Sequence, residues 1–351
     1  MKLPPLKIGK CESKFPVIQA GMGVKIGSAT LAAETIKQGG FGTIASVGMG
    51  DPEEGKYNFI ETCNKLFADE IRKAQQLCDN QAPLGINVMV AISNYKEIVE
   101  TAVKEGVDFI ISGAGLPLNL PEYVPAESGI ALIPVVSSGR ALDVILKTWN
   151  RKYNRKPDAV IVEGPRNGGH LGFTMEMIEH PETCSLDILL KEIKTSLAAF
   201  DCGNIPVLAA EMVSCRADIE RMLQMGYDGV QIGTHFICAE ESGIDRKSKE
   251  VYVNAKAEDV VIIKSPVGLP VRVLKTPLVQ RVLNGERAKF TCPYRCLRTC
   301  NPAQSLFCIA RALLAPHAGD TENGLYMCGS NIEAVTRIYP LKEFFDTLHG
   351  E

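Results

Sequence analysis

The sequence predicts an α/β fold, and more closely a TIM (β/α)8 barrel, from three observations. First, short apolar runs recur along the chain, each closed by Gly, Ser or Asn and followed by a segment with helical spacing. Second, runs such as IALIPVVSS and DAVIVEG are continuously apolar, which is typical of parallel strands covered on both faces. Third, there are eight such runs, and eight strand–helix units in series favour a closed barrel over an open sheet.

The elements are expected in a fixed order along the chain. The predicted strands are Pro16–Ala20, Phe41–Ser46, Pro83–Val90, Phe109–Ala114, Ala131–Ser138, Ala159–Gly164, Pro206–Glu211 and Gly229–Thr234. The predicted helices are Ser28–Gln38, Asn94–Glu105, Ala141–Trp149, Leu186–Phe200, Ser214–Met225 and, last, Pro340–Leu348. Residues 51–80 lengthen the connection after strand two. We therefore predict a barrel over residues 1–238, a cysteine-containing insert or lid over its mouth at 239–316, and a C-terminal helical segment at 317–351 that completes the barrel domain.

The composition is that of an ordinary globular protein. The 351 residues are 46% hydrophobic and 23% charged, with a formal net charge of −3. This charge gives no general attraction to phosphate backbones or anionic membranes, so we expect neither nucleic acid nor a membrane as a partner. The N-terminus has no apolar core of signal-peptide length and no later stretch is long enough to span a membrane, so we expect a cytoplasmic protein. The sequence neither requires nor excludes a homo-oligomer.

The stretch AVIVEGPRNGGHLGF, residues 159–173, is the first candidate for a functional loop. Its apolar strand ends at Glu163-Gly164, and Gly168 and Gly169 then precede His170. Two adjacent glycines let backbone N–H groups approach an anion closely, and a histidine titrates near neutral pH. Taken alone, Gly168, Gly169 and His170 fit a glycine-rich turn as well as they fit a functional loop. The place at the end of predicted strand six favours a site, because TIM-barrel active sites lie after the strands.

Three other strand ends carry candidate ligand-binding residues. Small residues at Gln19–Gly23 let a flat ligand lie against the backbone, although a tight turn explains them as well. Asn87 interrupts an apolar strand, and its amide needs partners from neighbouring backbone or from a ligand. Gly233-Thr234 offers backbone N–H groups and a hydroxyl to a phosphate, and Gln231 either joins that site or pairs inside the barrel.

Taken together, the motifs PVIQAGMG, GIN, EGPxxGGHLGF and DGVQIGT resemble the nitronate monooxygenase (2-nitropropane dioxygenase) family. That family is related to the flavin-dependent enoyl-acyl-carrier-protein reductase II enzymes, and the likeness runs from about residue 14 to residue 276, including SPVGLPVRVLK. It implies a barrel that binds FMN at its C-terminal mouth, with His170 as the active-site histidine. The implied flavin contacts are Gln19, Gly21, Met22, Gly23, Asn87, Gly169, Gln231, Gly233 and Thr234. We add Gly168, whose missing Cβ lets the backbone approach FMN.

The sequence departs from the family pattern at three places. Glu211 and Met212 stand where the family has a glycine pair at the flavin phosphate, and a carboxylate there costs energy unless Glu211 turns away or meets a cation. His235 replaces an arginine that often follows Gly-Thr. Arg166-Asn167 replaces smaller residues, and Arg166 is expected to be solvated.

The resemblance implies two kinds of reaction at one pocket. In the first, an alkyl nitronate is oxidised with O2 to a carbonyl compound and nitrite, while His170 orients the nitro oxygens or acts as base on a nitroalkane. In the second, NAD(P)H is a co-substrate and an enoyl thioester or quinone is reduced. A non-enzymatic binding barrel remains an alternative. A nucleotide dehydrogenase is disfavoured because no cysteine follows strand six.

Cysteines form a cluster outside the family motifs. Cys292, Cys296, Cys300 and Cys308 occur as C-x3-C-x3-C-x7-C within the predicted insert, and a cytosolic chain keeps its thiols reduced. Four thiols this close are candidate ligands of an iron–sulfur cluster or of zinc. The spacing matches no common metal pattern, and cysteines also serve as small apolar packers, so the principal prediction is that no metal is bound.

Overall fold

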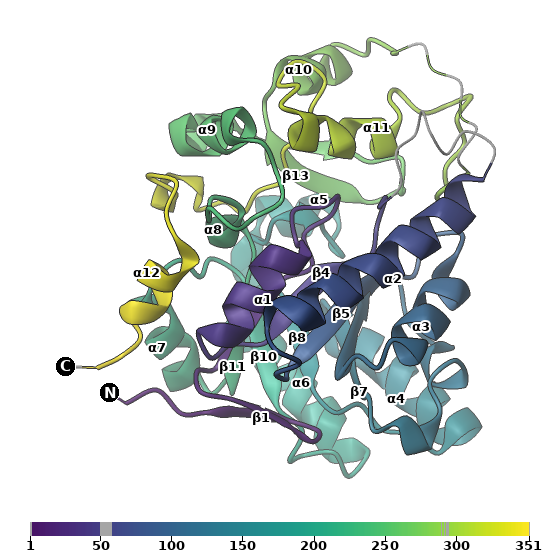
Figure 1. Cartoon of the computed structure of the whole chain (residues 1–351), viewed down its shortest axis with the longest axis vertical. Coiled ribbons are helices and arrows are strands. Elements are labelled where there is room, and N and C mark those ends of the chain that lie inside the picture. The colour runs from purple at the N-terminus through teal and green to yellow at the C-terminus, as the bar shows by residue number, and fades with distance from the viewer. Residues whose placement is uncertain (1, 50–57, 289, 291, 293–294, 351) are drawn as a thin grey trace.

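The computed structural model describes residues 2–49, 58–288, 290, 292 and 295–350, and its centre is a parallel barrel (Figure 1). Eight strands follow one another in the order β3-β11-β10-β8-β7-β6-β5-β4. They are β3 (Val17–Gln19), β4 (Gly42–Ala45), β5 (Leu84–Met89), β6 (Phe109–Gly113), β7 (Ala131–Val136), β8 (Val160–Glu163), β10 (Val207–Ala210) and β11 (Gly229–Ile232). A parallel bridge between Ile18 and Phe41 joins the two outer strands. The predicted TIM barrel and its predicted strands are therefore confirmed.

Helices cover the outside of the barrel. They are α1 (Ala29–Lys37), α2 (Phe59–Leu77), α3 (Tyr95–Lys104), α4 (Gly139–Tyr153), α5 (Met175–Glu179), α6 (Leu186–Ala199), α7 (Arg216–Met225) and α8 (Thr234–Ile237), with 3-10 helices η1 (Leu120–Glu122), η2 (Ala126–Ser128) and η3 (Pro181–Cys184). Serines after the strands start two of them, because Ser28 Oγ accepts the N–H of Leu31 and Ser138 Oγ accepts that of Ala141. The predicted helices within the barrel are confirmed.

Helix α2 occupies most of the segment that the sequence analysis treats as an insert after strand two. It is the helix that a barrel unit requires there, and residues 50–57 lie outside the described part of the chain. Its buried face is a narrow stripe of Cys63, Phe67, Ile71, Ala74 and Cys78. Most of its other residues are polar or charged, and Leu66 and Leu77 are exposed, which is why the apolar pattern is weak in the sequence.

An N-terminal hairpin that the sequence analysis does not predict fills the lower end of the barrel. Strands β1 (Leu6–Ile8) and β2 (Cys11–Ser13) pair antiparallel, and Gly9 takes a φ of +57° in the turn. Leu6 and Ile8 share a buried cluster with Phe41 and Phe109 inside the barrel. The hairpin therefore closes the end of the barrel opposite to the C-terminal ends of its strands (Figure 1).

The segment after β11 builds a second layer over the other end of the barrel. It contains α9 (Arg246–Asn254), η4 (Ala257–Asp259), β12 (Val260–Lys264), β13 (Pro270–Leu274), α10 (Pro277–Leu283), α11 (Ile309–Leu314) and η5 (Ala315–Ala318). Strand β13 pairs with β12 and also with β9 (Gly169–His170), where Val271 lies opposite His170. The loop with the candidate histidine is thus held by the segment predicted as a lid. Its action as a lid stays a prediction.

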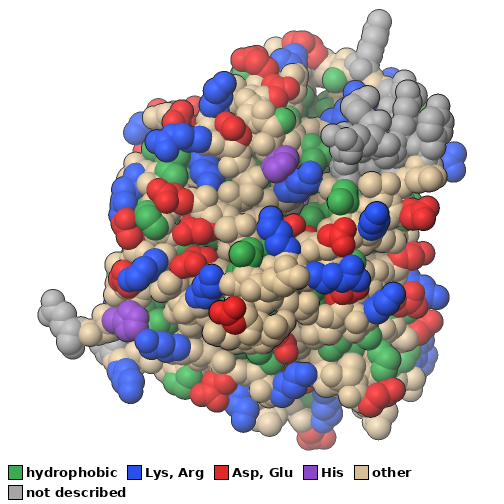
Figure 2. All heavy atoms as spheres, in the orientation of Figure 1, with side chains coloured by type: hydrophobic (Ala, Val, Ile, Leu, Met, Phe, Trp, Pro, Cys, Tyr) green, Lys and Arg blue, Asp and Glu red, His purple; other side chains and the backbone are tan. Residues whose placement is uncertain are grey.

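The surface mixes charges of both signs, and Figure 2 shows Lys and Arg interspersed with Asp and Glu over the visible face. This matches the small net charge of the sequence. Within the described ranges, no helix has both the length and the apolar character needed to cross a membrane.

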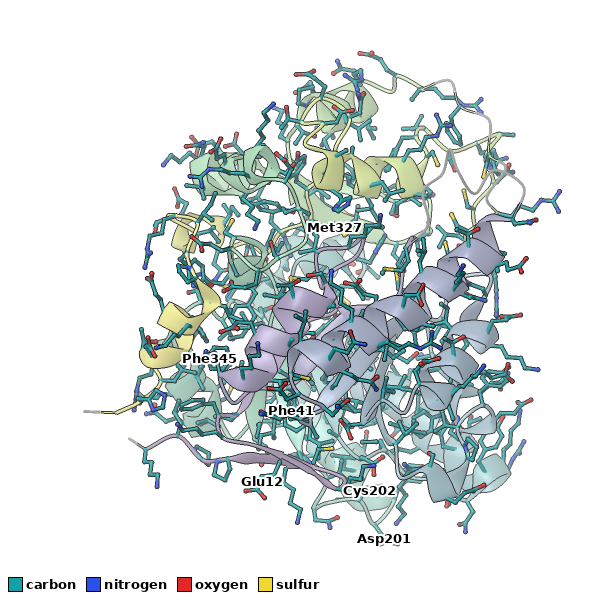
Figure 3. The ribbon with its side chains drawn as sticks, viewed as in Figure 1. Glu12, Phe41, Asp201, Cys202, Met327 and Phe345 are labelled. Carbon is teal, nitrogen blue, oxygen red and sulfur yellow. The ribbon has the colours of Figure 1, made fainter. Side chains whose placement is uncertain are left out.

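The C-terminal segment returns to the side of the barrel. It contains η6 (Ile332–Ala334) and α12 (Leu341–Asp346), which confirms the predicted last helix. Phe345, which is labelled in Figure 3, packs against Phe15 and Phe236, with ring centroids 6.0 and 6.1 Å from its own. Upstream, Met327 forms an antiparallel bridge with Val273 of β13. The end of the chain therefore contacts both the barrel and the layer over its mouth.

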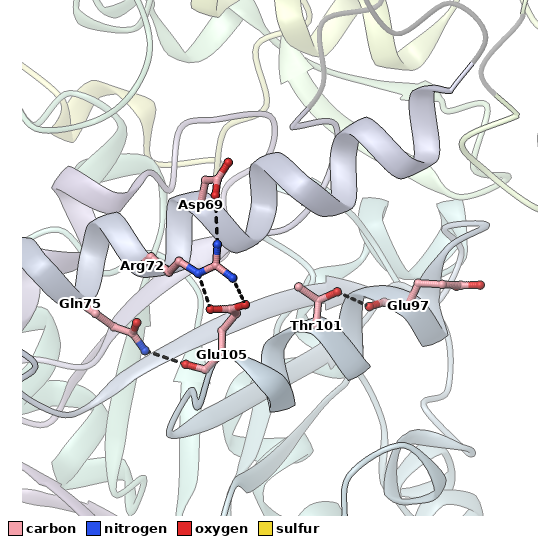
Figure 4. A network of polar contacts seen from close by, with 6 residues as sticks. All are labelled: Asp69, Arg72, Gln75, Glu97, Thr101 and Glu105. Atoms are coloured by element: carbon pink, nitrogen blue, oxygen red, sulfur yellow. Dashed lines mark hydrogen bonds and ion pairs between the residues drawn. The ribbon is translucent and has the colours of Figure 1, made fainter.

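An ion-pair network fixes α2 against the end of α3 (Figure 4). Arg72 makes a bidentate contact with Glu105, with Nη2–Oε1 at 2.6 Å and Nε–Oε2 at 2.7 Å, and it also meets Asp69. Gln75 donates to the carbonyl of Glu105 at 2.8 Å. The planar guanidinium suits this geometry. The network adds polar contacts to the packing that holds the neighbouring barrel helices together.

Candidate active site

A cavity of about 680 Å³ opens at the C-terminal ends of the barrel strands. Its floor and walls come from the ends of β3, β5, β6, β7, β8 and β11, and its upper side comes from the segment after the barrel. Apolar side chains dominate the lining, with a few polar groups among them. Such a composition is typical of a site for a largely flat or apolar small molecule.

A second hollow, of about 760 Å³, lies at the opposite end of the barrel near Leu6 and Tyr227. Its carboxylates are already used by the sheet, since Asp158 accepts the N–H of Leu132 and Asp228 accepts that of Val207. This hollow therefore offers no convergent reactive groups, and the cavity at the strand ends is the candidate site.

The structure brings the sequence-predicted site residues together with one exception. The predicted residues that line the cavity are Gly21, Met22, Gly23, Asn87, Gly168, Gly169, His170, Gln231, Gly233 and Thr234. Gln19 does not. Its side chain is 0% exposed, its Nε2 donates to the carbonyl of Thr43 at 2.7 Å, and its Oε1 accepts from Thr35. Gln19 therefore lies behind the turn, and the expectation that it contacts the ligand is not supported.

The glycines at the mouth serve different purposes. A Cβ on Gly21 would lie 2.1 Å from the Cβ of Asn87, so glycine is required for these two strand ends to meet. Gly169 takes a φ of +75°, which favours glycine. A Cβ on Gly168 would lie 2.7 Å from the backbone of Cys328. Gly168 is thus needed for the approach of the C-terminal segment, whereas the sequence analysis assigned its missing Cβ to the flavin.

Two side-chain amides in the cavity have no partner among the residues that the structure describes. Asn87 and Gln231 both line it, and neither side chain hydrogen-bonds to another residue in the part of the chain that the structure describes. An amide that is largely withdrawn from water gains from a ligand carrying both donors and acceptors. These amides are the polar recognition groups of the cavity.

His170 is held by a residue that the sequence analysis named only as part of a motif. Its Nε2 lies 2.7 Å from Ser265 Oγ, and the same oxygen accepts the N–H of Val267 at 3.2 Å. Ser265 Oγ can donate to an unprotonated Nε2 or accept from a protonated one, so it holds the ring in either neutral tautomer. Burial lowers the pKa of His170 to about 4. The imidazole is therefore neutral at physiological pH.

Glu163 is a second titratable group in the cavity, and the sequence analysis gave it no role. It is the last residue of β8 and lies opposite Ala210 of β10. Burial raises its pKa to about 7, while a hydrogen bond from Asn167 opposes the shift. The site therefore contains a neutral histidine and a carboxyl group that titrates near neutral pH.

Glu211 turns away from the cavity. Its Oε2 accepts the backbone N–H of Arg166 at 2.7 Å, and the side chain is 7% exposed. Burial raises its pKa, while Arg166 and Arg272 lower it. Arg166 itself is exposed, as expected. Glu211 is therefore not among the residues that line the cavity.

The residues after β11 also deviate from the family pattern without blocking the cavity. Thr234 Oγ1 accepts the N–H of Gly329 at 2.8 Å, which leaves its own proton available to a ligand. His235 points into an aromatic cluster, with its ring 5.0 Å from Tyr339 and 5.6 Å from Phe344. Burial lowers its pKa to about 4. His235 is therefore a packing residue.

Arg298 is a site residue that the sequence analysis missed. Within the described ranges it is the one lysine or arginine that lines the cavity, and its side chain forms no ion pair or hydrogen bond there. The N–H of Arg298 donates to the carbonyl of Ala91 at 2.9 Å, which fixes the segment at the mouth. No motif points to this residue, because a position after the barrel is brought to the mouth only by folding.

The cysteines of the predicted insert lie beside this site. Cys292, Cys296 and Cys308 pack against Cys63 of α2. Burial, together with the nearby thiols of Cys308, Cys292 and Cys300, raises the pKa of Cys296 to about 12. Among the residues that the structure describes, no group of three or more His, Cys, Asp or Glu side chains is arranged to hold a metal ion.

The protein is a TIM barrel with a cavity at the carboxyl ends of its strands, and comparisons with known proteins show that it is an oxidoreductase and give its family. The chain belongs to the nitronate monooxygenase family, whose sequence model matches residues 5–351. Members of this family are flavin enzymes. The resemblance noted from the four motifs is thereby confirmed.

Individual relatives are distant. The chain is 28% identical over 276 residues to a (3aS,4S,5R,7aS)-5-hydroxy-7a-methyl-1-oxo-octahydro-1H-indene-4-carboxyl-CoA dehydrogenase of Mycobacterium tuberculosis, which covers 79% of this chain and 67% of the relative. It is 26% identical over 306 residues to a probable nitronate monooxygenase of Staphylococcus saprophyticus, covering 80% and 81%. The solved structure of FabK from Thermotoga maritima is similar with a TM-score of 0.70 and 26% identity, covering 96% of this chain and 92% of that one.

Proposed function

We propose that this protein is an FMN-dependent nitronate monooxygenase, which oxidises alkyl nitronates with O2 to a carbonyl compound and nitrite. The observation that carries the proposal is the pairing of a neutral His170, held by Ser265, with the unpaired cation of Arg298 at the same cavity. A nitronate is a small anion. The cavity therefore offers it a counter-charge and a hydrogen-bonding imidazole.

The residues of the cavity fit FMN. The unpaired amides of Asn87 and Gln231 provide donors and acceptors for the polar edge of a flavin ring, and Met22 provides an apolar contact. Gly169, Gly233 and Thr234 line the region where the phosphate is expected, with backbone N–H groups and a hydroxyl. Bound FMN supplies the redox chemistry, accepting electrons from the substrate and giving them to O2.

The pKa of His170 favours a substrate that is already an anionic nitronate over one that His170 must deprotonate. An imidazole whose pKa is lowered to about 4 is a weak base and is poorly suited to remove a proton from carbon. As a neutral group, His170 still has one ring N–H that can donate to the oxygens of a substrate that arrives already ionised. Arg298 stabilises the same negative charge from the mouth.

A second candidate is an NAD(P)H-dependent flavin reductase that acts on enoyl thioesters or quinones. It is favoured by the relative from Mycobacterium tuberculosis, whose name describes a coenzyme A ester as its substrate. In this case Arg298 would meet an anionic group of the coenzyme or of the pyridine nucleotide.

One experiment separates the two candidates. The purified protein is expected to be yellow, to consume O2 with a nitronate and to release nitrite. In parallel, the bound flavin is mixed anaerobically with NADH and with NADPH. Rapid bleaching by a pyridine nucleotide, together with no nitrite release from nitronates, would replace the first candidate by the second. The variant His170→Ala is expected to retain flavin and lose most turnover, and turnover like that of the wild type would remove His170 from the reaction.

A further inference from the structure

A side cavity of about 40 Å³ adjoins the large cavity at His170. The side chain of His170 lines both cavities, and so do Val47, Met89, Val267 and Leu313. The two cavities therefore meet around the histidine. A molecule that contacts His170 from the large cavity has the side cavity directly beside it.

The remaining wall of the side cavity is mostly apolar and comes from several parts of the chain. Helix α2 contributes Ile60, the loop after β5 contributes Ile92, and α11 contributes Ile309 and Ala310. The start of α2 and helix α11 lie at the same end of the barrel (Figure 1). An apolar cavity of this kind favours a hydrocarbon group over water, which finds too few polar partners there.

The polar groups that border the side cavity are already used or neutral. Ser46 Oγ donates to the carbonyl of Asn87 at 2.8 Å, and Asn94 Nδ2 donates to Asn64 Oδ1 at 2.7 Å. The thiol of Cys296 stays protonated, because burial and neighbouring thiols raise its pKa to about 12. A hydrocarbon group in the side cavity therefore takes no hydrogen bond away from these groups.

The size of the side cavity limits the group that it can hold. A cavity needs about 10–15 Å³ by the same measure to hold one water, and a methylene group is close to water in size. The side cavity therefore has room for about three carbon atoms of a chain.

We propose that the side cavity binds the alkyl tail of the substrate, and that it selects a straight-chain anion with a tail of about three carbons. The inference rests on the proposed function for the anionic head, which meets His170 and Arg298 in the large cavity. The tail then passes His170 into the side cavity. Ile309 and Ala310 are specificity-determining residues in this arrangement, since they line the side cavity and not the large one.

The test titrates the FMN-loaded protein with straight-chain carboxylates from acetate to octanoate. A carboxylate is a planar anion with two oxygens, as a nitronate is, but it is not oxidised by a flavin. The change in flavin absorbance gives Kd. Each buried methylene should lower Kd about fourfold, up to a tail of about three carbons, and longer tails should gain nothing more. A Kd that does not depend on chain length would overturn the proposal.

Two substitutions should move the preferred length in opposite directions. Ala310→Leu fills the side cavity and should shift the tightest binding to a shorter tail, whereas Ile309→Ala enlarges it and should shift the tightest binding to a longer one. Leu314→Ala is the matched control, because Leu314 lies on the same helix and lines neither cavity. Acetate has almost no tail and should bind every variant alike, which checks that the site is intact. An unchanged length profile in both cavity variants, or an equal shift in Leu314→Ala, contradicts the proposal.

A parallel assay separates this proposal from the proposed function. Nitrite release is measured with straight-chain nitronates of the same lengths. Carboxylate binding that depends on chain length, without nitrite release, keeps the tail site and removes the nitronate reaction. Nitrite release with kcat/KM independent of chain length keeps the reaction and removes the tail site.

Discussion

Replacing Glu163 by Gln tests the electrostatics of the cavity through protein stability. The folded-state pKa of Glu163 is about 7 against an ordinary value of 4.5, because burial disfavours the carboxylate. Folding therefore favours the protonated form, and the stability present below pH 4.5 is lost as the pH rises through 7. A difference of about 2.5 units corresponds to about 3 kcal/mol at most, since each unit is worth about 1.4 kcal/mol.

Glutamine keeps the size of the side chain and removes its ionisation. Relative to wild type, Glu163→Gln should gain up to about 3 kcal/mol of unfolding free energy above pH 7, and the gain should fade as the pH falls to 4.5. Urea denaturation of both proteins at a series of pH values, with flavin content matched, measures this difference. A difference that stays constant across the range would refute the raised pKa of Glu163.

Three further substitutions follow from the contacts of the site. Ser265→Ala leaves His170 Nε2 without its partner at 2.7 Å, so turnover should fall by about tenfold or more while flavin content is kept; unchanged kcat contradicts this. Arg298→Met should raise KM for a nitronate and leave kcat largely intact, whereas an equal loss in kcat would assign Arg298 another role. Gly21→Ala places a Cβ 2.1 Å from Asn87 Cβ and should cost about 1–3 kcal/mol of stability together with flavin affinity, both measured by thermal denaturation with and without FMN.

Part of the site was predictable because its residues lie near the carboxyl ends of strands. Asn87 and Gln231 lie in the last part of β5 and β11, and Thr234 follows β11. Parallel strands of a barrel bring their carboxyl ends to one mouth. Predicting where the strands end therefore also predicts which side chains lie close together at the mouth of the barrel. Gln19 shows the limit of this reasoning, since it is the last residue of β3 yet its side chain points to Thr35 and Thr43.

The pKa values of the cavity could not be predicted from the sequence. A histidine and a glutamate have ordinary values until burial is known. His170 is covered by β13, which pairs with its loop from more than 90 residues away, and Glu163 lies opposite Ala210 of β10. The orientation of Glu211 likewise depends on the N–H of Arg166 on a neighbouring strand end. Such long-range contacts leave no local pattern.

The sequence by itself determined the barrel, the order of its strands and the position of the glycine-histidine loop after the sixth strand, because hydrophobic periodicity and strand-end residues are local properties. The tertiary structure decided which groups surround that loop. In the folded chain Ser265 lies beside His170, and Arg298 lies at the mouth of the cavity. Cys63 packs against Cys292, Cys296 and Cys308, which are more than 200 residues away in the sequence. These contacts arise from packing between distant elements, and packing is fixed only when the whole chain has folded.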